Sequence, residues 1–66
     1  MIVINLDAVM AKRKIKLIDL AEKVDITLAN LSLLKTGKVR GVRFDTLNKL
    51  CEILDCQPGD IIKYKK

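Results

Sequence analysis

The chain has 66 residues, half of them hydrophobic, and its 13 Lys and Arg against 8 Asp and Glu give a formal net charge of +5. With no histidine, a single serine and no apolar run long enough to span a bilayer, the composition leaves nothing from which to assemble an active site and excludes a membrane-spanning segment. So short a chain forms one domain, 1–66. It buries only about 60% of the surface that its unfolded form exposes, so the domain is marginally stable alone. Association with a second copy would bury more of its apolar surface.

Two helices are predicted in the first third of the chain. The first begins after Asn5, a residue that suits a helix cap, and runs to about Lys14 with one apolar face. The basic residues at its end complement the helix dipole, which explains most of them better than DNA contact does. The second helix covers Leu17 to Val24, because apolar residues recur there at spacings of three, four and seven. Asp25 follows where the chain must turn sharply, and Asp tolerates the left-handed conformation.

A third helix follows this turn and completes the outline of a helix-turn-helix. Ile26 is expected to plug the core from within the turn, and Thr27 to cap a helix that runs from Leu28 to Thr36. Gly37 then stands where a helix that ends in the left-handed conformation favours glycine. The residues of this helix expected to face inward are Leu31 and Leu34.

Two further helical segments are predicted in the second half of the chain. The segment Asp45 to Asp55 carries an apolar stripe and is expected to form a fourth helix, with a surface ion pair between Asp45 and Lys49. Pro58 suits the first position of a short fifth helical turn, whose free N–H groups Asp60 can reach. The residues of the fourth helix expected to face inward are Leu47, Leu50, Cys51 and Leu54.

Both ends of the chain are rich in β-prone residues. Ile2 to Ile4 and Ile61 to Lys65 could pair as a small two-stranded sheet, and the alternation of Ile62 and Tyr64 permits one buried face. An isolated two-stranded ribbon is marginal in water, so the pair would have to rest on the helices or on a second subunit. The alternative is a frayed tail.

The two cysteines, Cys51 and Cys56, lie five positions apart. A zinc site usually needs four ligands in paired short spacings, and such a set is absent. A disulfide would close a very short loop and constrain little, so reduced thiols in a cytoplasmic protein are the better interpretation. No signal peptide is visible at Met1 to Leu6. We expect no cofactor, no metal and no small-molecule effector.

The helix-turn-helix segment and the region after it resemble one known family. The matching features in chain order are Leu20-Ala21, a turn at Asp25, Ile26-Thr27, Leu31, Leu34, Gly37 and Leu47, together with the segment Phe44 to Ile62. This pattern resembles the Cro and lambda-repressor type of helix-turn-helix domain, also called the XRE family. The resemblance implies an all-α fold, a compact five-helix lambda-repressor-like domain, to which the β-prone termini could add the small two-stranded sheet. It also implies sequence-specific binding of double-stranded DNA as a transcriptional regulator.

The resemblance assigns the DNA contacts to the second helix of the motif and to the loop after it. In helix-turn-helix proteins this recognition helix enters the major groove, and its first turn meets base edges. Residues 35–43 contain four basic side chains and no acid, which makes them the best phosphate-facing strip in the chain. The expected groove-facing residues are Thr27, Leu28, Ala29, Asn30, Ser32 and Leu33, and the residues expected on phosphates are Lys35, Thr36, Lys38, Arg40 and Arg43.

The sequence departs from the family pattern at DNA-facing positions. Leu17 stands where many members carry a Gln that clamps a phosphate, and Asp25 stands where Gly is usual. In the recognition helix, only the side chains of Asn30 and Ser32 clearly can form hydrogen bonds to base edges. Of these, Asn30 suits adenine, while Leu and Ala suit the methyl group of thymine, so readout is expected to favour A·T-rich sequence. The alternative is that Leu28 and Leu33 are partly covered by a neighbouring subunit or by the loop.

The leading interpretation is a cytoplasmic homodimer that binds two DNA half-sites about one helical turn apart. The positive charge suits such a polyanionic partner, or it serves only to keep a hydrophobic small domain soluble. The alternative function is a protein-interaction module, antitoxin-like or an adaptor, that retains the fold and presents the apolar recognition helix to a protein. Groove binding should weaken steeply with salt, whereas an apolar contact should not.

Overall fold

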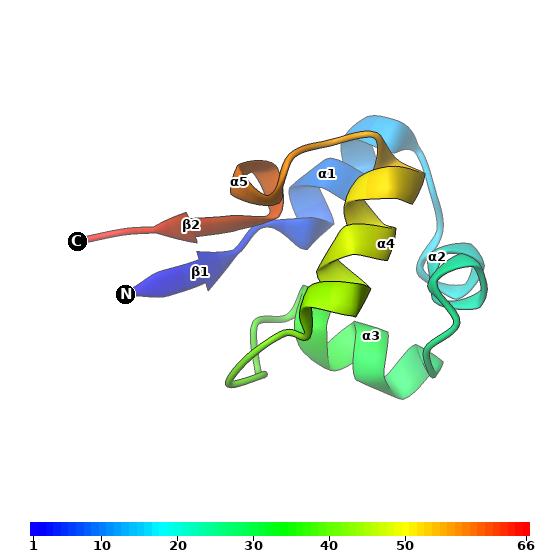
Figure 1. Ribbon diagram of the computed structural model, residues 1–66, viewed down its shortest axis with the longest axis horizontal. Helices are drawn as coiled ribbons and strands as arrows, with labels where there is room; N and C mark the ends of the chain where they lie inside the picture. The colour runs from blue at the N-terminus through cyan, green and yellow to red at the C-terminus, as the bar shows by residue number, and fades with distance from the viewer.

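Five helices surround one core, and a two-stranded sheet projects from them with both termini at its tip (Figure 1). The computed structural model describes residues 1–66. In chain order the elements are β1 (Ile2–Ile4), α1 (Leu6–Arg13), α2 (Leu17–Val24), α3 (Leu28–Lys35), α4 (Phe44–Leu54), α5 (Pro58–Ile61) and β2 (Ile62–Tyr64). None of the helices is long and apolar enough to cross a bilayer. The predicted five-helix domain with a terminal sheet is confirmed, and the first four helices end within one residue of their predicted boundaries.

The core consists of eleven buried side chains, all of them apolar, and every helix contributes at least one. Helix α2 packs against both α3 and α4, so the helix-turn-helix is held from behind by α4. A fully buried Leu or Ile contributes about 1.5–3 kcal/mol to the stability of such a core. The buried residues are Leu6, Val9, Met10, Leu20, Ala21, Val24, Leu31, Leu34, Leu50, Leu54 and Ile61.

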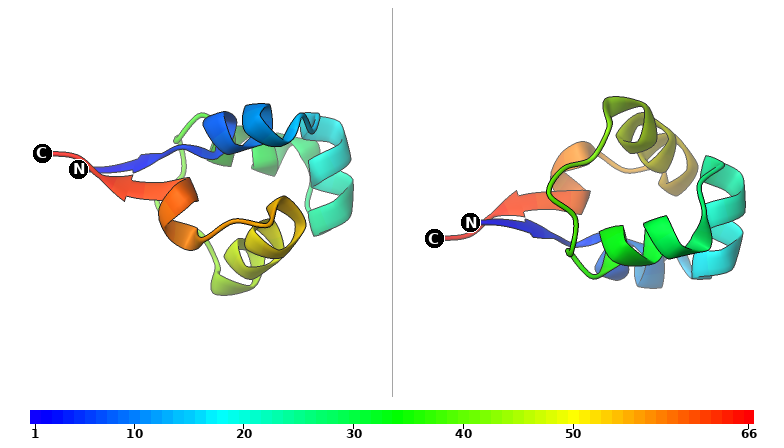
Figure 2. Two further views of the ribbon diagram at one scale, coloured as in Figure 1. Left: turned by 90° about the horizontal axis from the view of Figure 1, so that it is seen from above. Right: turned by 90° about the horizontal axis from the view of Figure 1, so that it is seen from below.

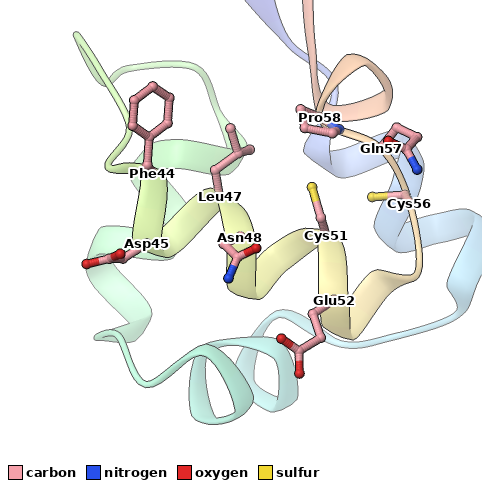
Figure 3. Close-up of a pocket in the computed structure, with 9 residues that line it drawn as sticks. All are labelled: Phe44, Asp45, Leu47, Asn48, Cys51, Glu52, Cys56, Gln57 and Pro58. Atoms are coloured by element: carbon pink, nitrogen blue, oxygen red, sulfur yellow. The ribbon is translucent and has the colours of Figure 1, made fainter.

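Two residues of the apolar stripe on α4 are less buried than predicted. Leu47 and Cys51 are half-buried and line a groove between α4 and the start of α5 (Figure 3). Both pack against the core, so the prediction that they face inward is confirmed, although their burial is only partial. Leu50 and Leu54, on the other side of the stripe, are buried as predicted.

Four helices end in the same way, with one residue in the left-handed conformation. These residues are Lys14 (φ 55°), Asp25 (φ 58°), Gly37 (φ 75°) and Asp55 (φ 50°). In each case the N–H of the following residue donates to the carbonyl five positions earlier, at 3.0 to 3.2 Å, which closes the end of the helix. The predicted sharp turn at Asp25 and the predicted conformation of Gly37 are therefore confirmed.

Asn5 precedes α1, but its side chain does not cap the helix. Its backbone N–H donates to the carbonyl of Ile61 at 2.6 Å, which extends the pairing of the two terminal strands. Its backbone angles (φ −110°, ψ 26°) also differ from the extended conformation that a capping residue adopts. The predicted cap is wrong because the sheet determines the conformation of Asn5. In α5, by contrast, Asp60 accepts the N–H of Gln57 at 2.9 Å, as expected.

The terminal strands pair antiparallel, with Ile2 opposite Tyr64 and Ile4 opposite Ile62. These four residues share one face of the sheet, because opposite residues of an antiparallel pair point the same way. At the base of the sheet Ile4 and Ile62 pack against the core, whereas Ile2 and Tyr64 at the tip are exposed. The predicted pairing is confirmed, and the predicted buried face is covered only at its base.

Candidate nucleic-acid interface

Helix α3 is fastened to the domain along one face only. Leu31 and Leu34 are buried and fix its inner face. At its start, Thr27 Oγ1 accepts the N–H of Asn30 at 3.1 Å, so Thr27 caps the helix as predicted. Ile26, in the turn before it, is half-buried against the core. The inner face and the entry of α3 are thus fixed, and its outer face is left free for a ligand.

The outer face of α3 is mainly apolar. Leu28 and Leu33 are each 45% exposed, and Ala29 is exposed between them. Asn30 is also exposed and lies at the flank, where it shares a shallow hollow with the α2–α3 turn. Ser32 is half-buried, so it is less available to a base edge than its position in the predicted set implied. The structure therefore brings five of the six predicted groove-facing residues to the surface, and Asn30 is the exposed amide among them.

Three cations of the predicted phosphate strip are free. The side chains of Lys38, Arg40 and Arg43 are exposed, and none makes an ion pair or a hydrogen bond within the chain. They belong to the segment between α3 and α4, which lies beside α3 on the same side of the molecule (Figure 2, right). An anion that approached α3 would meet these unpaired charges.

The other two members of the strip are engaged within the chain. Lys35 Nζ lies 3.6 Å from Asp7 Oδ1 on α1, and this is the one ion pair of the structure. The ion pair predicted between Asp45 and Lys49 is therefore not formed. The hydroxyl of Thr36 lies 3.1 Å from the carbonyls of the two residues one turn earlier and donates to its own helix. Since a phosphate oxygen needs a donor, that proton is not free for DNA.

Comparison with known proteins decides the family. The family model described as the Cro/C1-type HTH DNA-binding domain matches residues 5–66. The chain belongs to this family. It is 52% identical over 64 residues to YozG of Bacillus subtilis, an uncharacterized HTH-type transcriptional regulator, which covers 97% of this chain and 76% of that protein. The crystal structure of a candidate DNA-binding protein from Bacteroides fragilis has the same fold, with a TM-score of 0.85 and 24% identity, over 96% of this chain and all of that one.

The first residue of α2 is apolar. Leu17, in place of the expected Gln, is half-buried and packs against the core, so it has no group with which to clamp a phosphate. Ile18 beside it is 60% exposed, which the sequence analysis missed although this residue lies off the apolar stripe of α2. Lys16 precedes the helix with no side-chain cap, so the first N–H groups of α2 stay available.

Arg43 has a second role that the sequence analysis missed. It is the N-cap residue of α4, because the helix begins at Phe44, one residue earlier than predicted. No side chain caps this end, so the N–H groups of the first turn of α4 have no side-chain partner. The free N–H groups and the charge of Arg43 favour an anion at this end of α4, whereas Asp45 in the first turn opposes one.

The two cysteines are free thiols at the groove between α4 and α5. Burial raises the pKa of the Cys56 thiol, and the neighbouring Cys51 and Asp60 add to the rise, while Arg13 opposes it. Cys56 is therefore protonated at neutral pH. The pair forms at the end of α4, where the N–H of Cys56 donates to the carbonyl of Cys51 at 3.1 Å.

Proposed function

We propose that this Cro/C1-type domain is a transcriptional regulator that reads double-stranded DNA with α3 in the major groove. The observation that carries the proposal is the division of α3 into two faces: Leu31 and Leu34 are buried, and the opposite side is open beside three unpaired cations. A helix fixed in this way can enter the groove while its inner face stays on the core. The name of the Bacillus subtilis relative, an HTH-type transcriptional regulator, supports the regulatory role.

Base readout would rest on apolar contacts and one amide. Leu28, Ala29 and Leu33 have no hydrogen-bonding groups in their side chains, so they suit the methyl group of thymine. Asn30 can address N6 and N7 of adenine in a bidentate way, worth about 1–3 kcal/mol of discrimination. Because Ser32 is half-buried, Asn30 carries most of the polar readout. The expected target is an A·T-rich half-site.

Phosphate contacts would come from the segment that follows α3. Lys38, Arg40 and Arg43 are the strongest candidates, because their charges are unpaired. Lys35 and Thr36 contribute less, since Asp7 and the carbonyls of α3 already engage them. Three contacts give a slope of about 2.7 for log affinity against log salt in each protomer, and about 5 for a dimer.

A homodimer would present two copies of α3 to half-sites about 34 Å apart. Two features support this assembly. The domain is so small that its core is marginal alone, and seven large hydrophobic side chains remain exposed. Those on the outer face of α3 are assigned to DNA, and the others are available to a second subunit.

The proposal can be tested by following backbone amide resonances of ¹⁵N-labelled protein during titration with duplex DNA of mixed sequence at low salt. We expect shifts concentrated in residues 27–43, and we expect them to disappear as salt is raised. Shifts confined to the groove between α4 and α5, or no shift at any salt concentration, would contradict DNA binding by α3. Binding of a protein to α3 that is insensitive to salt would favour the interaction module instead.

A further inference from the structure

The two cysteines stand at the two ends of one hydrogen bond that closes α4. The N–H of Cys56 donates to the carbonyl of Cys51 at 3.1 Å, across a left-handed residue. A helix end of this kind frequently brings the side chains of the two bonded residues into contact. At the matching ends of α1 and α2 the bonded residues are apolar, namely Met10 with Ile15 and Ala21 with Ile26. At the end of α4 they are two thiols, which can bind a ligand as well as pack.

Both thiols open onto the groove between α4 and the start of α5. Cys51 rises from the helix into this groove, and the side chain of Cys56 points toward it from the loop (Figure 3). Both are free and half-buried, and both pack against the core. No further Cys, Asp or Glu completes a set of three ligands with them. The pair is therefore a site with two sulfur atoms and no third ligand.

The backbone on both sides of Cys56 is held in place. Before it, Arg13 of α1 donates from its guanidinium to the carbonyl of Asp55 at 2.8 Å. After it, Asp60 accepts the N–H of Gln57 at 2.9 Å and fixes the start of α5. A ligand that binds both sulfur atoms therefore does not have to order this segment, which favours binding.

The charges of the groove favour a cation. Asp45 and Glu52 are its charged lining residues, and no Lys or Arg lines it, although the chain as a whole carries +5. Lys12 and Arg13 line a separate hollow that one of the thiols also borders, and Asp60 lies there with them. An acidic wall attracts positive ions, so a cation approaches the pair most readily through the groove.

We propose that Cys51 and Cys56 together bind one Cu⁺ ion. Sulfur ligands select soft ions such as Cu⁺, and two thiolates suffice for this ion because it forms linear two-coordinate complexes. Structural zinc needs four ligands, and Ca²⁺ and Mg²⁺ need six or more, mostly oxygen atoms, so the pair suits none of them. On binding, two S–H bonds break and two Cu–S bonds form, both protons pass to the solvent, and the ion is neither oxidised nor reduced. The proposal does not depend on DNA binding by α3.

The test is a competition for Cu⁺ between the reduced full chain and the coloured chelator bicinchoninate, without oxygen. We expect the wild-type chain to remove one Cu⁺ per chain from the chelator. C51S and C56S should each bind at least about 100-fold more weakly, since even the loss of an outer partner of a metal ligand costs about 10–100-fold. Circular dichroism checks that both variants fold.

The matched control keeps the number of thiols and changes their place. In C56S/I18C the second thiol stands on α2, at an exposed position outside the groove. This double variant should bind Cu⁺ no better than C56S. If it binds like wild type, any two thiols suffice and the proposed site is refuted.

X-ray absorption at the copper edge identifies the ligands in the wild-type chain, without any variant. We expect two sulfur neighbours and no third ligand, and we expect the loaded chain to sediment as the metal-free chain does. A wild-type chain that takes no Cu⁺ from the chelator, or copper that joins several chains into a larger species, overturns the proposal. All these measurements omit DNA, so a failure of the copper site is distinguishable from a failure of DNA binding.

Discussion

Removal of the side chains of Arg40 and Arg43 should flatten the salt dependence of DNA binding. Each cation that neutralises a phosphate adds about 0.9 to the slope of log affinity against log salt, so the double variant R40A/R43A should lose about 1.8 per protomer. Between about 50 mM and about 200 mM salt, the affinity of one variant protomer for a single half-site should therefore fall about tenfold less than that of a wild-type protomer. Fluorescence anisotropy titrations of a labelled duplex at four salt concentrations measure the slope.

Lys35 supplies the matched control, because it belongs to the same strip but lies 3.6 Å from Asp7 through its Nζ. An exposed ion pair of this kind is worth little for stability, so K35A should fold normally. The slope for K35A should fall by clearly less than the value of about 0.9 expected for a full phosphate contact. If R40A/R43A keeps the wild-type slope, or if K35A flattens it as much as either arginine does, our assignment of the phosphate contacts is refuted.

Three further predictions concern single residues. N30A should lose discrimination at one base position by about 1–3 kcal/mol in competition binding, and an equal loss on all sequences would instead place Asn30 on the DNA backbone. L31A should lower the free energy of unfolding in urea by about 2–5 kcal/mol, because Leu31 is completely buried, and a loss below about 1 kcal/mol would contradict its place in the core. Cys56 should react with iodoacetamide at pH 8 more slowly in the folded protein than in urea. The reason is that burial raises the pKa of its thiol and the thiolate is the reactive form. Equal rates in the folded and the unfolded protein would contradict the burial of this thiol.

Local signals in the sequence were sufficient for the helices and their ends. The left-handed conformation of Asp25 and Gly37 was predictable, because Asp and Gly are among the residue types that tolerate it. The capping of α3 by Thr27 follows in the same way, because the bond joins residues only three apart. The pairing of the termini was predictable from β-prone composition, although the partners lie at opposite ends of the chain.

Other features that depend on distant parts of the chain were not predictable. The ion pair that engages Lys35 involves Asp7 on α1, far away in sequence. Leu47 and Cys51 are only half-buried although they lie on the apolar stripe of α4, and a stripe alone does not say how completely other elements cover each of its residues. For the same reason, the sequence showed a candidate strip of phosphate contacts but could not separate its free cations from its engaged members.

The most direct test of the account is selection of bound duplexes from a random DNA pool by the wild-type protein. We expect enrichment of an A·T-rich half-site that recurs with its centre about 10 base pairs from that of its symmetric copy. Such a result would establish sequence-specific readout by α3 in a dimer. A pool that shows no enriched sequence after repeated rounds would contradict the central claim.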